Sequence, residues 1–193
     1  MKISIPIYIV LNLVISSFQT PFCDRLKKLE NTTKLDYNEN ILDGFIVTDN
    51  VFPLNDQEFQ NFYKRERSSS EKCYLVSKFS INEKRTGVIS YVISYEGDKI
   101  VDYYDLNLIE NCNVLKTYRI MISDSETMYY NVSSKIKSNF SVLTITEETS
   151  SEEINGKVDT LFTKKWKIDL RSPNLDTISK KKFFKILPSP PQK

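Results

Sequence analysis

The most constraining feature of this chain is a series of strand-like runs joined by links of hairpin length. Eight runs are rich in β-branched and aromatic residues, and several of them alternate: 42–50, 73–81, 87–96, 99–109, 113–123, 126–136, 139–148 and 157–170. Most links are short and carry turn chemistry, as at Gly97-Asp98 and Asn155-Gly156. Strands joined in this way form an up-and-down antiparallel sheet, which must close on itself or pack on a second sheet to hide its edges. The sequence therefore predicts an all-β fold.

One long connection, residues 51–72, separates the first two runs. Its stretch NDQEFQNFYKRER predicts a short helix with Asn55 or Asp56 as its N-cap. The side chains that this helix would bury are Phe59, Phe62 and Tyr63. Elsewhere the composition favours strand, because the chain has no Ala and many Ile, Val, Thr, Tyr and Phe residues.

The N-terminal residues 1–19 predict a secretory signal peptide. A lysine precedes an apolar run over residues 3–15, and small and polar residues follow. The alternative is a membrane anchor, but this run is shorter than the about 20 residues of a spanning helix, and no later segment is apolar enough to span. Sequons for N-glycosylation begin at Asn31, Asn131 and Asn139. We therefore expect a secreted, extracellular glycoprotein.

The absence of histidine excludes several kinds of chemistry. Without His the chain cannot build Ser-His-Asp or Cys-His nucleophile systems, or His-ligated zinc, copper or haem sites, although a Tyr- or Cys-ligated haem stays formally open. No glycine-rich phosphate loop and no CxxC metal site is present. The net charge of +2 is too small to indicate nucleic acid or an anionic membrane surface as a partner. We predict no metal and no cofactor.

Carboxylate pairs are the remaining catalytic candidates. The glutamates at 147–148 and 152–153, and Asp102 with Asp105, are candidates for general acid and base. The glutamates fall in a polar loop, and the aspartates occupy strand-edge positions among tyrosines. Solvated positions explain these carboxylates better than catalysis does, so we predict that the chain is not an enzyme.

The chain ends in a strand followed by a helix-like pattern, KWKIDLRSPNLDTISKKKFFKILP. Ser172 is placed as an N-cap and Pro173 as the first helical residue. Apolar residues then recur at helical spacing, and lysines gather toward the end, where the helix dipole favours cations. The pattern predicts a helix over 172–187 on the outer wall of the sheet. It completes a single domain of residues 20–187, followed by a disordered tail at 188–193.

These segments resemble the lipocalin family, in particular its apolipoprotein D and insect bilin-binding branch. LRSPNLD at 170–176 is similar to the family's C-terminal motif, in which the last strand ends in Leu-Arg before a helix. LDYNENILDGFIV at 35–47 resembles the segment that leads into the first strand, and EKCYLVSKFSI at 71–81 resembles the second strand. The resemblance implies an eight-stranded antiparallel up-and-down barrel with one long first loop and a C-terminal α-helix.

The chain departs from the family at its first motif, Gly-x-Trp. Asp43 stands at the glycine position and Phe45 at the tryptophan position, and the family's Thr-Asp-Tyr motif is not convincingly present. In the family, the arginine after the last strand packs on that tryptophan at the closed end of the barrel. The resemblance therefore implies a structural contact of Arg171 with Phe45. The alternative is that Arg171 is a surface charge.

The same layout places the cysteines. If the first strand rises toward the open end, Cys112 lies at the closed end, which the N-terminal segment also crosses, and this implies a disulfide between Cys23 and Cys112. In the family, the cysteine of the second strand pairs with a cysteine in the C-terminal tail. This tail has none, so Cys73 is expected to be free. The alternative disulfide joins Cys73 to Cys112.

A barrel of this size has room for filling side chains or for one small ligand. The alternating runs place aromatic and aliphatic residues on shared strand faces. The candidate ligand-binding residues are Phe45, Phe79, Tyr91, Ile93, Tyr104, Leu106, Tyr118, Ile120 and Trp166. For any one of them core packing is the simpler explanation, and alternation alone does not fix which face points inward.

Two functions are consistent with these sequence features. The first is a secreted, non-enzymatic carrier that binds or sequesters a small hydrophobic or amphipathic ligand, such as a lipid, in the barrel cavity. The alternative is a secreted interaction protein with a filled barrel, which acts on a host or partner protein through loops at 51–72 and 147–153. Uptake of a fluorescent fatty acid with quenching of Trp166 favours the carrier, whereas side chains that close the cavity favour the interaction protein.

Overall fold

The computed structural model describes residues 22–32, 35–37, 51–97, 99–124, 130–152, 158–175 and 177–186. Three of the predictions therefore fall outside the described residues. They concern the signal peptide at 1–19, the first strand at 42–50 with Phe45, and the tail at 188–193.

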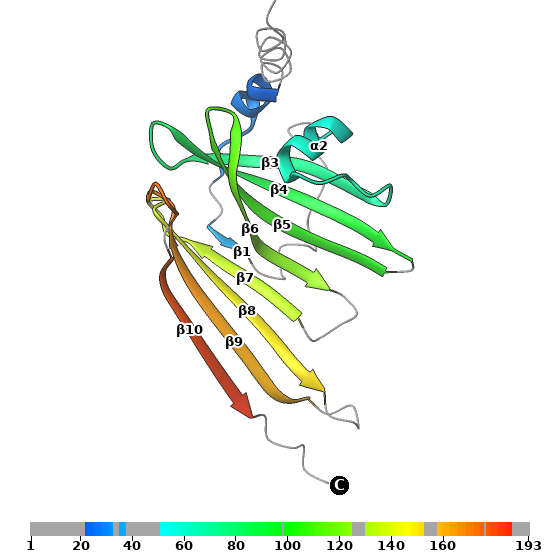
Figure 1. Cartoon of the computed structure of the whole chain (residues 1–193), viewed down its shortest axis with the longest axis vertical. Coiled ribbons are helices and arrows are strands. Elements are labelled where there is room, and N and C mark those ends of the chain that lie inside the picture. The colour runs from blue at the N-terminus through cyan, green and yellow to red at the C-terminus, as the bar shows by residue number, and fades with distance from the viewer. Residues whose placement is uncertain are drawn as a thin grey trace, which may run out of the picture.

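The described residues form one antiparallel sheet with short helices on it (Figure 1). The elements are β1 Asp36–Tyr37, β2 Phe52–Pro53, α2 Asp56–Tyr63, β3 Glu71–Ser80, β4 Arg85–Glu96, β5 Lys99–Glu110, β6 Asn113–Asp124, β7 Tyr130–Ile136, β8 Val142–Glu152, β9 Val158–Asp169 and β10 Thr177–Ile186. From β2 to β10 each strand pairs with the next in the chain, and β1 pairs with β7. The predicted all-β, up-and-down order is confirmed.

The sheet is not closed among the described strands. Its two edges are β2 and β10, which do not pair with each other. Closure needs a first strand that offers a full ladder, but β2 is two residues long and includes Pro53, which has no N–H to donate. The eight-stranded barrel implied by the lipocalin resemblance is thus not what the described strands form, and they form an open sheet instead.

The sheet has two halves, β2–β6 and β7–β10. Among the described residues, β6 and β7 pair at one position, Ile122 with Val132. Further along β7, the short β1 pairs with it instead of β6, with Tyr37 opposite Ser134. In Figure 1 the N-terminal half, β2–β6, lies above the C-terminal half, β7–β10, which extends away from it.

One end of the sheet curls back on itself. Phe79 at the end of β3 stacks on Phe140 in the β7–β8 turn, with ring centroids 4.6 Å apart, although β3 and β7 are four strands apart in the sheet. Gly87 makes room for this contact, because a Cβ there would lie 2.4 Å from Cζ of Phe79. We call this the curled end; it carries the turns at 81–84, 111–112 and 137–141 and the residues 170–175 that follow β9.

The predicted C-terminal helix over 172–187 is wrong for residues 177–186, which form β10. β10 pairs with β9 from Thr177 opposite Ile168 to Ile186 opposite Thr160. The Ser172-Pro173 signal that suggested a helix start lies instead in the turn between β9 and β10. Ser and Pro suit both structures, and a long ladder on a neighbouring strand outweighs a marginal helix of mixed propensity.

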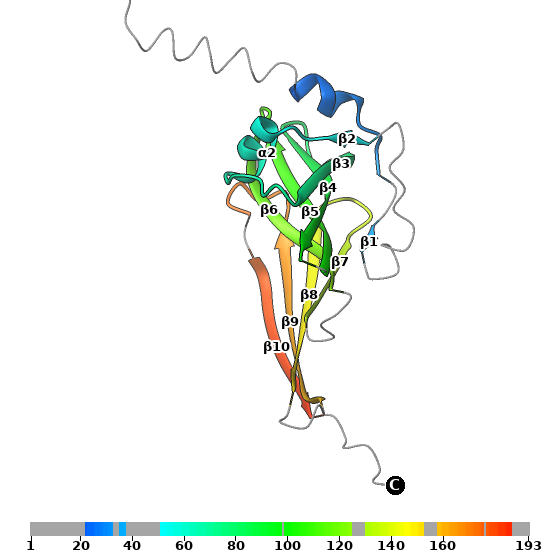
Figure 2. The same cartoon turned by 90° about the vertical axis from the view of Figure 1, so that its right-hand side faces the viewer.

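The two faces of the sheet carry separate apolar clusters. The face that carries Tyr91 and Tyr104, here called the tyrosine face, packs side chains from β1 and from β3–β9 into one cluster. The opposite face, here called the helix face, is covered over β3–β6 by α2 and by a helix at residues 22–28. Figure 2 shows α2 and β1 on opposite sides of the sheet.

α2 forms as its sequence predicts. Asn55 is the N-cap, and its side chain accepts a hydrogen bond of 2.9 Å from the backbone N–H of Glu58. The Glu58 carboxylate in turn accepts one of 3.0 Å from the backbone N–H of Asn55. Phe59 and Phe62 are buried against the helix face.

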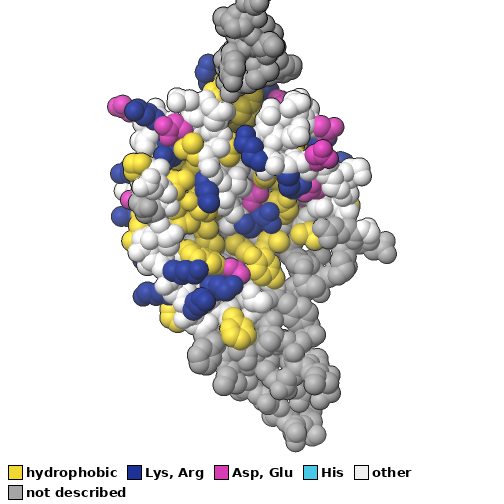
Figure 3. Space-filling model, viewed as in Figure 1, with side chains coloured by type: hydrophobic (Ala, Val, Ile, Leu, Met, Phe, Trp, Pro, Cys, Tyr) yellow, Lys and Arg dark blue, Asp and Glu magenta, His cyan; other side chains and the backbone are white. Residues whose placement is uncertain are grey.

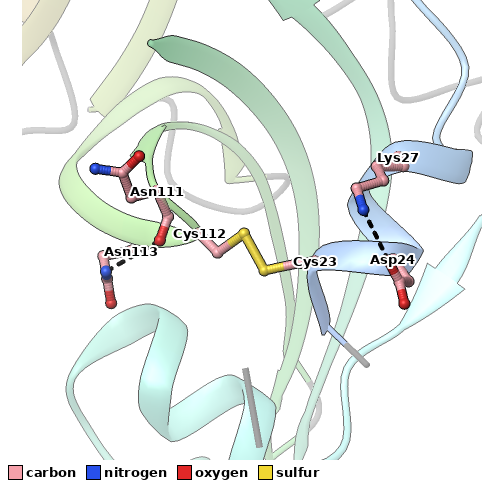
Figure 4. The surroundings of a disulfide bond; sticks show 6 residues. All are labelled: Cys23, Asp24, Lys27, Asn111, Cys112 and Asn113. Atoms are coloured by element: carbon pink, nitrogen blue, oxygen red, sulfur yellow. Dashed lines mark hydrogen bonds and ion pairs between the residues drawn. A yellow bond between two sulfur atoms is a disulfide. The ribbon is translucent and has the colours of Figure 1, made fainter. Parts of the chain in front are cut away.

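The disulfide joins Cys23, in the helix at 22–28, to Cys112 in the β5–β6 turn (Figure 4). This is the first of the two pairings expected from the sequence, and Cys73 is a buried free thiol. The bond fastens the N-terminal helix to the curled end. Over the residues that the structure describes, no helix has both the length and the apolar character to cross a membrane.

Candidate ligand-binding face

The predicted ligand-lining residues share the tyrosine face. Phe45 lies outside the described residues. The other eight all belong to the tyrosine-face cluster or pack against it: Phe79, Tyr91, Ile93, Tyr104, Leu106, Tyr118, Ile120 and Trp166. Cross-strand pairing explains this, since Tyr91 lies opposite Tyr104 and Leu106 lies opposite Tyr118.

Most of this set is tightly packed. Phe79, Tyr91, Tyr104, Leu106 and Ile120 are buried, and the last two have no exposed surface. The three other members are partly exposed: Ile93, Tyr118 and Trp166. The described part of the face is therefore an apolar floor with a partly exposed rim.

Three tyrosines form the polar element of this floor. Tyr104 lies between Tyr91 and Tyr37, with ring centroids 5.1 and 6.0 Å away. The hydroxyl of Tyr91 donates to Oδ2 of Asp102 at 2.8 Å. Burial raises the pKa of Tyr37 to about 12 and the pKa values of Tyr91 and Tyr104 well above their usual range. All three are therefore protonated hydroxyls at physiological pH.

The contribution of Tyr37 was not predicted from the sequence. It lies in a two-residue strand that has no alternation to detect, and it reaches the cluster only because β1 pairs with β7.

Positive charge lies beside Trp166 on the same face. Nζ of Lys180, directly opposite on β10, lies 5.9 Å from the Trp166 ring centroid. Lys164, two residues before Trp166, donates to Oε1 of Glu147 at 3.0 Å. Glu147, one of the carboxylates considered for catalysis, is thus held in an ion pair.

The helix face carries a polar network beneath α2 that was not predicted from the sequence. The hydroxyls of Tyr63 and Ser90 lie 2.6 Å apart, and Asn107 donates to Ser90 Oγ at 2.8 Å. Thr117 donates to the Asn107 side chain at 2.8 Å, and the Cys73 thiol donates to the Tyr63 hydroxyl at 3.8 Å. The polar positions that alternate with the aromatic residues of β4 and β5 were the available signal for this network.

Asp102 and Asp105 do not form a catalytic pair. Asp102 lies on the tyrosine face with Tyr91, whereas Asp105 is buried on the helix face, where Nε of Arg119 donates to it at 2.6 Å. The Arg119 guanidinium also lies 3.3 Å from the ring centroid of Tyr103. Burial raises the pKa of Asp105 above its usual value, and the charge of Arg119 opposes this shift.

The loop after α2 is held by one buried carboxylate. Arg65 donates two hydrogen bonds of 2.6 Å to Glu71, and the Ser68 backbone donates a third at 3.1 Å. The hydrogen bonds from Arg65 lower the pKa of Glu71 below its usual value. This part of the predicted 51–72 contact loop is therefore closely tied to the sheet.

The predicted contact of Arg171 with Phe45 is untested, because Phe45 lies outside the described residues. Arg171 is exposed and donates to the Asn139 carbonyl at 2.9 Å. At the curled end a different arginine, Arg85, reaches the β9–β10 turn.

No family model, curated protein or solved structure matches the chain. Among the residues that the structure describes, Cys, Asp and Glu side chains form no group of three that could hold a metal ion.

Proposed function

We propose that this chain is a secreted, non-enzymatic carrier that holds a small hydrophobic or amphipathic molecule against the tyrosine face. One observation carries the proposal: every described residue predicted to line a ligand site contributes to the same aromatic-rich cluster. Scattered core residues would have divided between the two faces of the sheet. The lipocalin resemblance stays a prediction, and the proposal does not depend on a closed barrel.

The chemistry of the face suggests where such a molecule would lie. Leu106 and Ile120 have no exposed surface, so the ligand would contact the partly exposed side chains of Ile93, Tyr118 and Trp166. Apolar contact supplies most of the binding free energy at such a site, at about 25 cal/mol per Å² of apolar surface removed from water. Lys180 beside Trp166 would favour an anionic group on the ligand.

Fluorescence titration tests the proposal, because Trp166 is the single tryptophan of the chain and lies at the rim. A fluorescent fatty-acid probe is expected to quench Trp166 on binding, and native mass spectrometry of the secreted protein is expected to show a co-purified small molecule. A native mass equal to that of the protein alone, together with unchanged Trp166 fluorescence on addition of the probe, contradicts the carrier proposal.

A matched pair of variants locates the site. Ile93→Asp places a carboxylate on the rim and is expected to weaken probe binding at least 10-fold, which corresponds to about 1.4 kcal/mol. Leu115→Asp makes the same chemical change at an exposed side chain outside the tyrosine-face cluster and is expected to leave binding unchanged. If both variants bind the probe equally well, the binding site does not lie on this face.

The packed floor also favours the second candidate, a secreted interaction protein. Five of the eight described lining residues are buried, as expected for a filled interior. This candidate predicts no probe binding and the same amide-exchange protection at Tyr104 and Leu106 with and without the probe. A ligand bound over the tyrosine face would instead increase protection at these two positions.

A further inference from the structure

The outer edge of β10 is a long strand edge that no described strand covers. β10 is ten residues long and stands at the end of the sheet, with β9 as its one partner among the described strands. At the other end of the sheet, β2 pairs with Tyr74 and Leu75 of β3, and residues 30–32 bond to the backbone of Lys78. Among the described residues, the β10 edge therefore offers the longest uncovered row of backbone donors and acceptors.

Lysines are placed against lysines along this edge. Lys182 lies directly opposite Lys164, and Lys181 lies directly opposite Lys165. Like charges at directly opposed positions destabilise a sheet. Of these four lysines, Lys164 alone forms an ion pair within the described part of the chain, with Glu147 at 3.0 Å. Figure 3 shows Lys and Arg side chains gathered in this lower part of the described surface.

The lysines alternate between the two faces of the sheet. Lys180 and Lys182 share the face of Trp166, and Lys181 points to the other face, because successive strand residues alternate. Positive charge therefore borders the free edge on both faces. Two apolar side chains flank the three lysines, Ile178 at 56% and Phe183 at 54% exposure. These two side chains offer apolar contact surface beside the lysines.

We propose that the β10 edge binds an extended acidic segment of another protein, which adds to the sheet as a further strand. Main-chain hydrogen bonds supply affinity in this mode, and side chains on alternating positions supply specificity. The segment would place consecutive acidic residues beside Lys180, Lys181 and Lys182, with apolar residues beside Ile178 and Phe183.

Charge selects this occupant over a second copy of the chain. A second β10 placed edge to edge would add further lysines beside three lysines, which repels. An acidic strand instead offsets the repulsion already present between β9 and β10. The lysines thus protect the edge from self-association while leaving it open to a strand of opposite charge.

A peptide-binding assay tests this proposal. The probe is a short peptide of three consecutive glutamates flanked on each side by Thr-Val, and its control has lysines in place of the glutamates. The acidic peptide is expected to bind the full chain at low ionic strength and to weaken at least 10-fold at about 1 M salt, where the Debye length falls to about 3 Å. The lysine peptide is expected not to bind. Equal binding of both peptides overturns the proposal.

Variants and hydrogen exchange identify the surface. Replacing Lys180, Lys181 and Lys182 by Glu is expected to abolish binding of the acidic peptide. The control replaces three exposed lysines elsewhere, Lys72, Lys84 and Lys116, and makes the same change in net charge. It is expected to retain at least half of the affinity. Equal losses in the two variants would show a response to net charge alone and overturn the proposal.

The added strand has its own signature. Backbone amides of β10 are expected to become protected from hydrogen exchange when the acidic peptide binds, because their outward N–H groups gain partners. Dextran sulfate is a polyanion that has no backbone amides. If it protects β10 equally, the lysines bind negative charge without strand addition, and the proposal is overturned.

Discussion

Nη1 of Arg85 donates a hydrogen bond of 2.9 Å to the carbonyl oxygen of Leu170, 85 positions later in the chain. The same nitrogen donates to the carbonyl of Ser172 at 2.7 Å, and Nη2 approaches Glu110 at 3.3 Å. Arg85 begins β4 and Leu170 follows β9, five strands away in the sheet. This buried guanidinium joins the two halves of the sheet at the curled end, where the described strands form no ladder between them.

Removing this guanidinium is expected to lower stability more than the loss of an exposed charge. Arg85→Met should reduce the free energy of unfolding by about 3 kcal/mol, because buried carbonyls lose charge-assisted hydrogen bonds. Arg85→Lys keeps the charge but not the two-pronged geometry and should lose about half as much. Urea unfolding measures both.

Lys84→Met is the matched control for Arg85→Met, since Lys84 is adjacent and exposed. Its effect should stay within about 0.5 kcal/mol. If Arg85→Met is as mild as Lys84→Met, the guanidinium does not hold the curled end.

The thiol of Cys73 should be unreactive in the folded protein. Burial raises its pKa to about 12, so almost no thiolate exists near pH 8. Iodoacetamide is expected to leave the native chain unmodified and to add one group after unfolding without reductant, as mass spectrometry would show. With reductant, three groups should be added, because Cys23 and Cys112 are released. Labelling of the native chain would contradict the buried position of this thiol.

Local patterns predicted the middle of the fold well. The alternation in β4 and β5 placed Tyr91 and Tyr104 among residues on shared strand faces, and the structure brings both to one face. Asn55, one of the two N-caps predicted from the sequence, caps α2. In each case the decisive contact lies within a few residues in the sequence or within one hairpin.

Long-range contacts account for what the sequence did not reveal. Residues 177–186 have a pattern that suits a helix end as well as a strand, and pairing with β9 decided between them. The position of Tyr37 in the tyrosine cluster depends on a two-residue strand, and the role of Arg85 depends on carbonyls 85 or more positions away. Periodicity within a window carries no information on such partners.

Two buried carboxylates should give stability opposite dependences on pH. The pKa of Glu71 is lowered in the folded state, so its stabilising contribution is present above its unfolded pKa of about 4.3 and is lost as pH falls through the lower folded value. The pKa of Asp105 is raised, so its ionisation reduces stability as pH rises from its unfolded value of about 3.9 to its folded value.

Glu71→Gln tests the first of these contributions. It should lower the free energy of unfolding by about 2 kcal/mol at pH 7, and the deficit should shrink below about pH 4. Asp105→Asn should show the reverse trend. Its free energy of unfolding, relative to that of the wild type, should rise as pH increases from about 3.9 to the raised folded pKa of Asp105. Urea unfolding at pH 3.5 and pH 7 distinguishes the two. Glu66→Gln, at an exposed neighbour of Arg65, is the control and should follow the wild type at both pH values.

The three sequons should differ in glycan occupancy. Asn139 is exposed in the β7–β8 turn, and its side chain accepts from the hydroxyl of Ser141 at 2.6 Å. Asn31 is also exposed. Asn131 differs, because it is only partly exposed in β7 and its Oδ1 is buried, so a glycan on the adjacent Nδ2 is expected to be disfavoured.

Expression in a eukaryotic secretory system followed by peptide mass analysis measures this difference. Enzymatic removal of N-glycans converts each occupied Asn to Asp, so Asn31 and Asn139 should shift in mass and Asn131 should not. Asn139→Gln should remove one glycan and leave folding intact, since the side chain is exposed. A folded, secreted chain with a glycan on Asn131 would contradict the packing of β7. Absence of glycans from all three positions would instead contradict passage through the secretory route that residues 1–19 predict.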